Sequence, residues 1–177
     1  MHFQSLPHTS HDLAVLRPLR EPDLDRWAAY LNDPAVYLHT SWDHPGVEEL
    51  RGYLGSDISG DPDARLRLAI AATSDDRLLG TIGFHTVSAR NRVAEITYDL
   101  HPEAWGRGVA TCMVDVMVRW AHEVAGIRRV QATVLETNAR SIRVVERAGF
   151  EREGLLRAYR SVRGEPGNFL MFAHVAG

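Results

Sequence analysis

The spacing of apolar residues along the chain predicts strands and helices in alternation. Residues 65–70 read Arg-Leu-Arg-Leu-Ala-Ile, and this alternation is typical of a strand with one buried face. Across 106–125, apolar residues recur every three or four positions, which predicts the longest helix of the chain. Further strands are expected at 13–19, 78–87, 93–100, 127–135, 150–162 and 168–175.

The remaining helices are indicated by proline and by capping residues. They are expected at 22–31, 45–54 and 138–148, with Pro22, Asp43 and Asn138 at or just before their starts. Asn32-Asp33-Pro34 is expected to end the first of these helices, and a loop rich in Gly and Asp is expected at 55–63.

This order of elements predicts one α/β domain with helices packed on the faces of a single mixed sheet. Three consecutive strands favour antiparallel pairing, and the strand–helix–strand unit that follows favours a parallel crossover. Pro18 favours an edge position for the first strand. We expect the domain to span 13–177, with about seven strands and four helices, after a flexible extension at 1–12.

Composition excludes several kinds of chemistry. All 20 basic residues are Arg, so no lysine can form a Schiff base or serve a P-loop. The net charge of −3 gives no indication of nucleic-acid binding. With Cys112 as the only cysteine, and no signal or membrane-spanning pattern, we expect a cytoplasmic protein without membrane contact. The histidine spacing predicts no metal site.

The candidate chemistry lies where the fourth strand ends and the long helix begins. Gly106 and Gly108 allow a tight turn and expose backbone N–H groups at a helix start, a combination that binds phosphate. Arg107 adds a positive charge, and the small Ala110 lets a ligand approach the backbone. The pattern matches neither the P-loop nor the dinucleotide fingerprint, so the glycines alone are equally compatible with an ordinary helix start.

Five segments in order, however, resemble one family. They are Trp105–Ala110, Leu16–Leu24, Asn138 with Ser141, Glu146–Phe150 and Glu153–Arg157. In this pattern the chain resembles the GNAT superfamily of acetyl-CoA-dependent N-acetyltransferases over 13–175. Within the superfamily it is similar to the branch that acetylates the N-terminal amines of ribosomal proteins. The resemblance implies a mixed, mostly antiparallel sheet in which the fourth and fifth strands splay apart.

The resemblance also implies a binding site for acetyl-CoA. The pantetheine arm would lie between the splayed strands, and the pyrophosphate would lie at the helix start. The implied cofactor-binding residues are Leu100, His101, Trp105, Gly106, Arg107, Gly108, Val109, Ala110, Thr111, Asn138 and Ser141. Arg140, Arg143 and Arg147 are read either as a solvated helix face or as contacts to the 3′-phosphate.

Two carboxylates are the candidates for catalysis. In related histone acetyltransferases the matching Ala-Glu-Ile carries the general base, which corresponds to Glu95; a solvent-facing strand residue is the alternative reading. The amide of Asp99 would stabilise the thioester oxyanion, and its carboxylate is the rival base. Such enzymes transfer acetyl directly in a ternary complex. Val145 stands where many members have a tyrosine acid, so the general acid is unassigned.

The acceptor is expected to be a primary amine. Tyr37 and Trp42, with His39, are expected either to line its pocket or to pack between helix and sheet, and His85 and His101 are candidate secondary proton carriers. The ribosomal-protein N-terminus is the first expectation for the acceptor. A polyamine, an aminoglycoside, and a non-catalytic CoA-binding module are the alternatives. The protein is expected to be a monomer or a homodimer.

Overall fold

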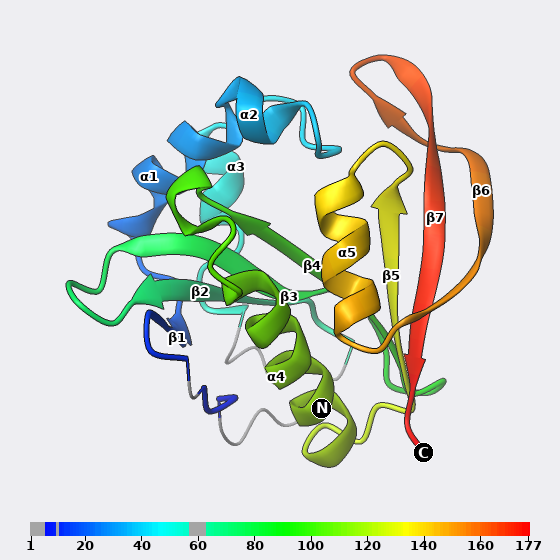
Figure 1. Ribbon diagram of the computed structural model, residues 1–177. Helices are drawn as coiled ribbons and strands as arrows, with labels where there is room; N and C mark the ends of the chain where they lie inside the picture. Colours follow the sequence, from blue (N-terminus) through cyan, green and yellow to red (C-terminus); the bar gives the residue numbers. More distant parts are fainter. Residues whose placement is uncertain (1–5, 10, 57–62) are drawn as a thin grey trace.

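The protein forms one seven-stranded sheet with helices on both faces, as a computed structural model that describes residues 6–9, 11–56 and 63–177 shows (Figure 1). The strand order is β1-β2-β3-β4-β5-β7-β6, so the predicted edge position of the first strand is confirmed. The strands are β1 (Ala14–Pro18), β2 (Leu66–Ala72), β3 (Leu78–Ser88), β4 (Val93–Leu100), β5 (Arg129–Leu135), β6 (Glu151–Val162) and β7 (Glu165–Val175).

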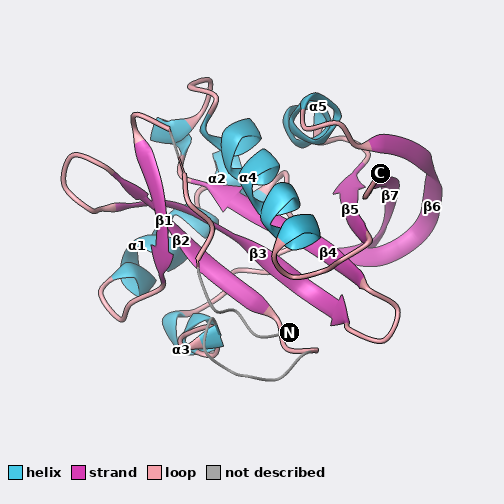
Figure 2. Ribbon diagram, turned by 90° about the horizontal axis from the view of Figure 1, so that it is seen from below, coloured by secondary structure: helices cyan, strands magenta, loops and turns pink. Residues whose placement is uncertain are grey.

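The helices lie in two layers. They are α1 (Asp23–Leu31), α2 (Pro34–Tyr37), α3 (Val47–Arg51), the 3-10 turn η2 (Pro102–Ala104), α4 (Val109–Glu123) and α5 (Ala139–Arg147). Figure 2 shows α4 and α5 on one side of the sheet and α1 and α3 on the other. Each layer has its own core: α4 packs on the strands around Ile82 and Phe172, and α1 packs around Trp27 and Leu50.

The sequence-based boundaries need four corrections. Asp33 caps the additional helix α2, because its side chain accepts a hydrogen bond from Ala35 N at 2.8 Å. The predicted capping of the next helix by Asp43 is wrong, since α3 follows Gly46 and no side chain caps it. The last strand begins at Glu165 rather than Asn168 because the turn is shorter than expected, and α4 begins at Val109 rather than Gly106.

The N-terminal extension and the loop are only partly described. Residues 1–5 and 10 of the expected extension 1–12, and 57–62 of the expected loop 55–63, lie outside the described residues.

The feature of the sheet that matters most is the parting of β4 and β5. β4 pairs with β3 along its whole length. With β5 it pairs in parallel at only three positions, where Val93–Glu95 lie opposite Arg129–Gln131. Beyond these three positions the two strands diverge, although β4 continues to Leu100 and β5 to Leu135. The predicted splay between the fourth and fifth strands is therefore confirmed.

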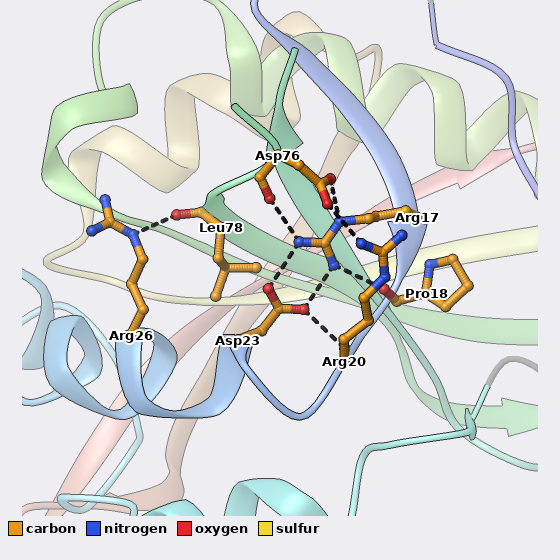
Figure 3. A network of polar contacts seen from close by, with 7 residues as sticks. All are labelled: Arg17, Pro18, Arg20, Asp23, Arg26, Asp76 and Leu78. Carbon is orange, nitrogen blue, oxygen red and sulfur yellow. Dashed lines mark hydrogen bonds and ion pairs between the residues drawn. The ribbon is translucent and has the colours of Figure 1, made fainter. Parts of the chain in front are cut away.

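An ion-pair network fixes the start of α1 to the sheet edge (Figure 3). Arg17 on β1 donates to both carboxylate oxygens of Asp23, at 2.7 and 2.8 Å, and its Nε donates to Asp76 at 2.7 Å. The bond to Asp23 raises the pKa of the Arg17 guanidinium, and the bond from Arg17 lowers the pKa of Asp76. This buried ion pair fixes the start of α1, the helix that carries Trp27 and Tyr30, to β1 at the sheet edge.

Close strand contact makes one glycine essential to the sheet. A Cβ atom on Gly83 of β3 would lie 1.9 Å from the Leu66 carbonyl oxygen, which belongs to the neighbouring strand and cannot move aside. We expect Gly83→Ala to destabilise the protein by about 2–3 kcal/mol, as overpacking typically does. The measurement is the free energy of unfolding in denaturant.

Gly154→Ala is the matched control, because Gly154 also lies in a strand and nothing would lie within 4 Å of its Cβ. Equal stabilities for the two variants would contradict the close packing of β3 against β2.

Candidate active site

Two adjoining cavities occupy the space where β4 and β5 part. The larger, of about 490 Å³, lies between the end of β4, the start of α4, and α5. The smaller, of about 120 Å³, lies between β4, β5 and the segment 39–42. Both are lined by His39, Thr40, Tyr98, Asn138 and Ser141. The two cavities therefore meet at the splay.

The start of α4 presents free N–H groups to the larger cavity. The first backbone hydrogen bond of the helix runs from Cys112 N to Gly108 O, so the N–H groups of residues 109–111 have no partner within the helix. Gly106 and Gly108 have φ angles of 72° and 77°, and no atom lies within 4 Å of the position a Cβ would take on either. This open, positively polarised backbone fits a phosphate group.

The opposite wall of the larger cavity is basic. Arg140, Arg143 and Arg147 of α5 line it, and the Arg140 guanidinium lies 4.2 Å from the centre of the Trp105 ring. An anionic ligand is therefore favoured from both walls. Of the expected cofactor residues, Leu100, Trp105, Gly106, Gly108, Val109, Ala110, Thr111, Asn138 and Ser141 line this cavity.

The structure does not bring Arg107 or His101 to the cavity wall. Arg107 is exposed. The N–H of His101 donates to Leu79 O at 2.8 Å, and the Leu100 carbonyl accepts from Trp105 Nε1 at 3.1 Å. The pantetheine contacts expected of Leu100 and His101 stay predictions.

Asn138 and Tyr98 join the two cavities. The Asn138 side chain accepts from Ser141 N at 3.0 Å, which confirms its predicted role as a helix cap, and also donates to His39 O at 2.9 Å. The Tyr98 hydroxyl lies 2.7 Å from Ser141 Oγ and bridges β4 to α5 across the splay. Burial raises the pKa of Tyr98 to about 12, so its hydroxyl stays protonated at neutral pH.

Glu95 lies at the last position at which β4 pairs with β5, and its side chain faces the interior. Its carboxylate accepts from Thr133 Oγ1 at 2.5 Å, from Gln131 Nε2 at 3.2 Å and from Arg160 at 3.1 Å. Only 5% of the side chain is exposed, so the alternative reading of Glu95 as a solvent-facing strand residue is wrong.

A β-bulge places His85 beside Glu95. Phe84 pairs with Ile96 and Thr86 with Glu95, which leaves His85 as the extra residue of β3. Its Nε2 lies 3.4 Å from Glu95 Oε1, and the smaller cavity is lined by His85. Burial lowers the pKa of His85, which favours the neutral ring. Bulges of this kind commonly redirect a side chain next to an active site.

Asp99 lies four residues along β4, on the same face as Glu95, and is fully engaged by donors. It forms an ion pair with the buried Arg67 and accepts from Tyr30 at 2.5 Å and from Trp27 Nε1 at 3.2 Å. Thr81 Oγ1 lies 2.9 Å from the same carboxylate. Burial, followed by the charge of Asp99, raises the pKa of Tyr30. The carboxylate therefore links α1, β2 and β3 to β4.

The expected acceptor residues separate. Trp42 lines the smaller cavity and also packs edge-on against Trp27, with 6.4 Å between ring centres. Tyr37 lines neither cavity; it stacks on His44 with ring centres 4.0 Å apart. Tyr37 is therefore used in local packing.

Sequence reasoning missed Arg160 and Phe169, which reach the smaller cavity from β6 and β7. It also missed Arg67. A signal for Arg67 was present, since β2 is otherwise apolar over 66–72 and a charged residue within it needs a buried partner.

Neither a metal centre nor a membrane span is found in the described part of the chain. Among the described residues, no three His, Cys, Asp or Glu side chains could hold one metal ion. Within the same part of the chain, no helix has the length and apolarity needed to cross a bilayer.

Comparisons with known proteins agree with this geometry. Residues 14–151 match the acetyltransferase (GNAT) domain family. The chain is 30% identical over 163 residues to an uncharacterized N-acetyltransferase, p20, from Bacillus licheniformis, covering 90% of each chain.

Two solved structures share the fold. One is a ribosomal-protein-S5-alanine acetyltransferase from Vibrio fischeri, with a TM-score of 0.82, 16% identity and 97% of both chains covered. The other is a spermidine N-acetyltransferase from Vibrio cholerae in complex with CoA and spermine, with a TM-score of 0.78, 18% identity and 92% of this chain and 95% of that chain covered. The chain therefore belongs to the GNAT family of acetyltransferases, and its acyl donor is acetyl-CoA.

Proposed function

We propose that this acetyltransferase acts on the N-terminal amine of a protein, by direct attack of the amine in a ternary complex. The observation that carries the proposal is the Glu95 carboxylate at the parting of β4 and β5, whose hydrogen-bond partners Thr133 and Arg160 line the smaller cavity. A buried carboxylate there can accept the proton that a primary amine must lose to become a nucleophile.

The larger cavity supports a binding role for the residues around the start of α4. The N–H groups of Val109, Ala110 and Thr111 would hold the pyrophosphate, and the arginines of α5 would hold the 3′-phosphate. Acetyl-CoA supplies the thioester carbonyl carbon: the amine nitrogen bonds to it, the carbon–sulfur bond breaks, and the sulfur leaves as a thiolate.

The proton then has a defined destination. The ammonium form of the acceptor gives one proton to Glu95 before attack, and the second excess proton passes from the nitrogen to water as the carbon–sulfur bond breaks and the amide forms. The thiolate, with an ordinary pKa of about 8.5, is protonated from water. Donors from Thr133 and Gln131 hold the Glu95 carboxylate in a fixed orientation during these transfers.

The smaller cavity supports a peptide N-terminus over a long polyamine. At about 120 Å³ it has room for an amine and one small side chain, with the rest of a peptide outside. None of the described residues that line it is Asp or Glu, so it offers no carboxylate for a second ammonium group. The ribosomal class of acceptor rests on the motif resemblance of Trp105–Ala110 and the segments around it.

Three further expectations belong to this proposal. The single domain spans 13–177, the protein works in the cytoplasm, and it is active as a monomer or a homodimer. The donors around Asp99 support a structural role for that carboxylate, which leaves Glu95 as the proposed base.

Glu95→Gln tests the proposed base. We expect kcat for acetylation of an alanine-initiated peptide to fall by about 10²–10⁴-fold, because the amide cannot accept the proton. The affinity for CoA, measured by calorimetry, should stay unchanged. Glu153→Gln is the control. Glu153 lies on β6, forms an exposed ion pair with Arg129 of β5, and lines neither cavity. Full activity in Glu95→Gln would overturn the assignment.

Asp99→Asn tests the structural role of the second carboxylate. The change leaves the Arg67 charge buried without its partner, and we expect unfolding to become easier by about 3–5 kcal/mol. Asp115→Asn is the matched control, because Asp115 forms an ion pair with Arg119 on the surface. This change should lower the free energy of unfolding by less than about 0.5 kcal/mol. A stable Asp99→Asn protein without activity would instead support Asp99 as the base.

Gly108→Ala tests the phosphate-binding backbone. Its Cβ would enter the open space at the start of α4, and we expect the dissociation constant for CoA to rise about tenfold or more. Gly126→Ala introduces a similar positive-φ strain at the other end of α4, where φ is 69°, and should leave CoA binding unchanged. Equal CoA affinities in both variants would place the cofactor elsewhere.

A further inference from the structure

Arg160 reaches the proposed base from β6, a strand that lies three positions from β4 in the sheet, beyond β5 and β7. The β6–β7 pairing is interrupted between Leu156 and Arg160, and Ala158 within the interruption has a φ of 50°. This irregular segment is held by a hydrogen bond from Ala158 N to Asn168 Oδ1 at 3.0 Å. The interruption therefore gives Arg160 a position that regular pairing does not supply.

The Arg160 guanidinium is only partly used by the protein. Its NH2 group donates to Glu95 Oε1 at 3.1 Å and to His85 Nε2 at 3.2 Å, and its plane lies over the Phe169 ring at 5.5 Å. The Nε and NH1 groups have no hydrogen-bond partner among the described residues. The side chain lines the smaller cavity and is 31% exposed. It therefore retains N–H donors for a ligand.

The neighbouring histidine is oriented by the same arginine. An arginine only donates, so the bond from Arg160 makes His85 Nε2 an acceptor and puts the ring proton on Nδ1. His85 Nδ1 is buried and has no partner among the described residues. The ring is consequently held in one tautomer by Arg160.

The charges around the smaller cavity favour an anion. Glu95 is the carboxylate nearest to Arg160, and it is already paired. A second arginine, Arg163, lies at the rim, where its NH1 donates to Tyr37 O at 3.2 Å and lies 3.4 Å from Thr40 O. Figure 1 shows the β6–β7 turn that carries Arg163 beside the end of α2. A bound carboxylate would meet the positive charge of Arg160, and Arg163 adds a second positive charge outside the cavity lining.

We propose that Arg160 recognises a carboxylate next to the acceptor's amine, so that the preferred acceptors are amines with a neighbouring carboxylate. This inference rests on the proposed function: an acidic peptide narrows the proposed acceptor, whereas a free amino acid would replace it. The carboxylate can be an acidic side chain near a peptide N-terminus or the α-carboxylate of a free amino acid. A carboxylate bound by Arg160 also competes with Glu95 for the guanidinium, which leaves Glu95 freer to take the proton of the amine.

Matched acceptor pairs test the proposal on the full-length protein with acetyl-CoA. The peptide pair begins Ala-Glu or Ala-Gln and is otherwise identical, and the free pair is alanine and alaninamide. We expect the acidic member of at least one pair to have a kcat/KM about tenfold or more higher, the size expected for hydrogen bonds to a charged group. The pair that shows the preference identifies the source of the carboxylate.

Variants assign the preference to Arg160. In Arg160→Gln, the acidic-to-neutral ratio of kcat/KM should fall to about one, mainly through a higher KM for the acidic acceptor, and Arg160→Lys should restore part of it. Arg157→Gln, an exposed arginine of the same strand that lines neither cavity, should leave the ratio unchanged. Because the ratio compares two acceptors on one variant, a general loss of activity does not affect it.

The outcomes separate this inference from the proposed function. Equal or lower kcat/KM for the acidic members overturns the role of Arg160 and leaves the N-terminal amine standing as the acceptor. A preference for spermidine overturns both the role of Arg160 and the proposed acceptor. If no acceptor is acetylated, the proposed acceptor class is wrong. Calorimetric binding of the Ala-Glu peptide to CoA-saturated protein then decides the role of Arg160, since the contact needs no turnover. Binding that is equal for both peptides contradicts it.

Discussion

The short parallel pairing between β4 and β5 is the constraint on which the site depends. A parallel pair that continued to Leu100 and Leu135 would close the sheet and leave no space for a ligand. By ending at Glu95, the pairing leaves strand edges unsatisfied within the molecule, and unpaired backbone groups in such a place require a partner. We propose that acetyl-CoA provides that partner. The Glu95 carboxylate then lies at the closed end of the gap between β4 and β5.

Holding β4 on the β3 side requires its own interactions, and the Asp99 network provides them. Asp99 lies four residues after Glu95, the last position at which β4 pairs with β5. It connects β4 to Arg67 of β2 and to Trp27 and Tyr30 of α1. On the β5 side, Tyr98 connects β4 to α5 through Ser141. Asn138, the cap of α5, is bonded to His39 in the segment that lines the smaller cavity. Polar groups on both sides of β4 therefore keep the splay open. The two carboxylates of one strand consequently have different environments, and we propose different roles for them.

The sequence predicted most of the fold because its signals are local. The alternation in 65–70, the helical spacing in 106–125 and the cap at Asn138 each depend on neighbours in the chain, and each element is present. The splay and the cofactor cavity were expected only from the resemblance to a family. Helix α2 was missed because Asn32-Asp33-Pro34 signals both the end of one helix and the start of another. The partners of Glu95 could not be predicted, because Arg160 depends on an irregular strand pairing and His85 on a bulge.

A crystal structure of the protein with bound coenzyme A tests the central claim most directly. The account predicts that the pyrophosphate lies against the N–H groups of Val109 to Thr111, that the pantetheine lies between β4 and β5, and that the sulfur points toward Glu95. Coenzyme A bound at another surface, with β4 and β5 still apart and the channel between them empty, would contradict it.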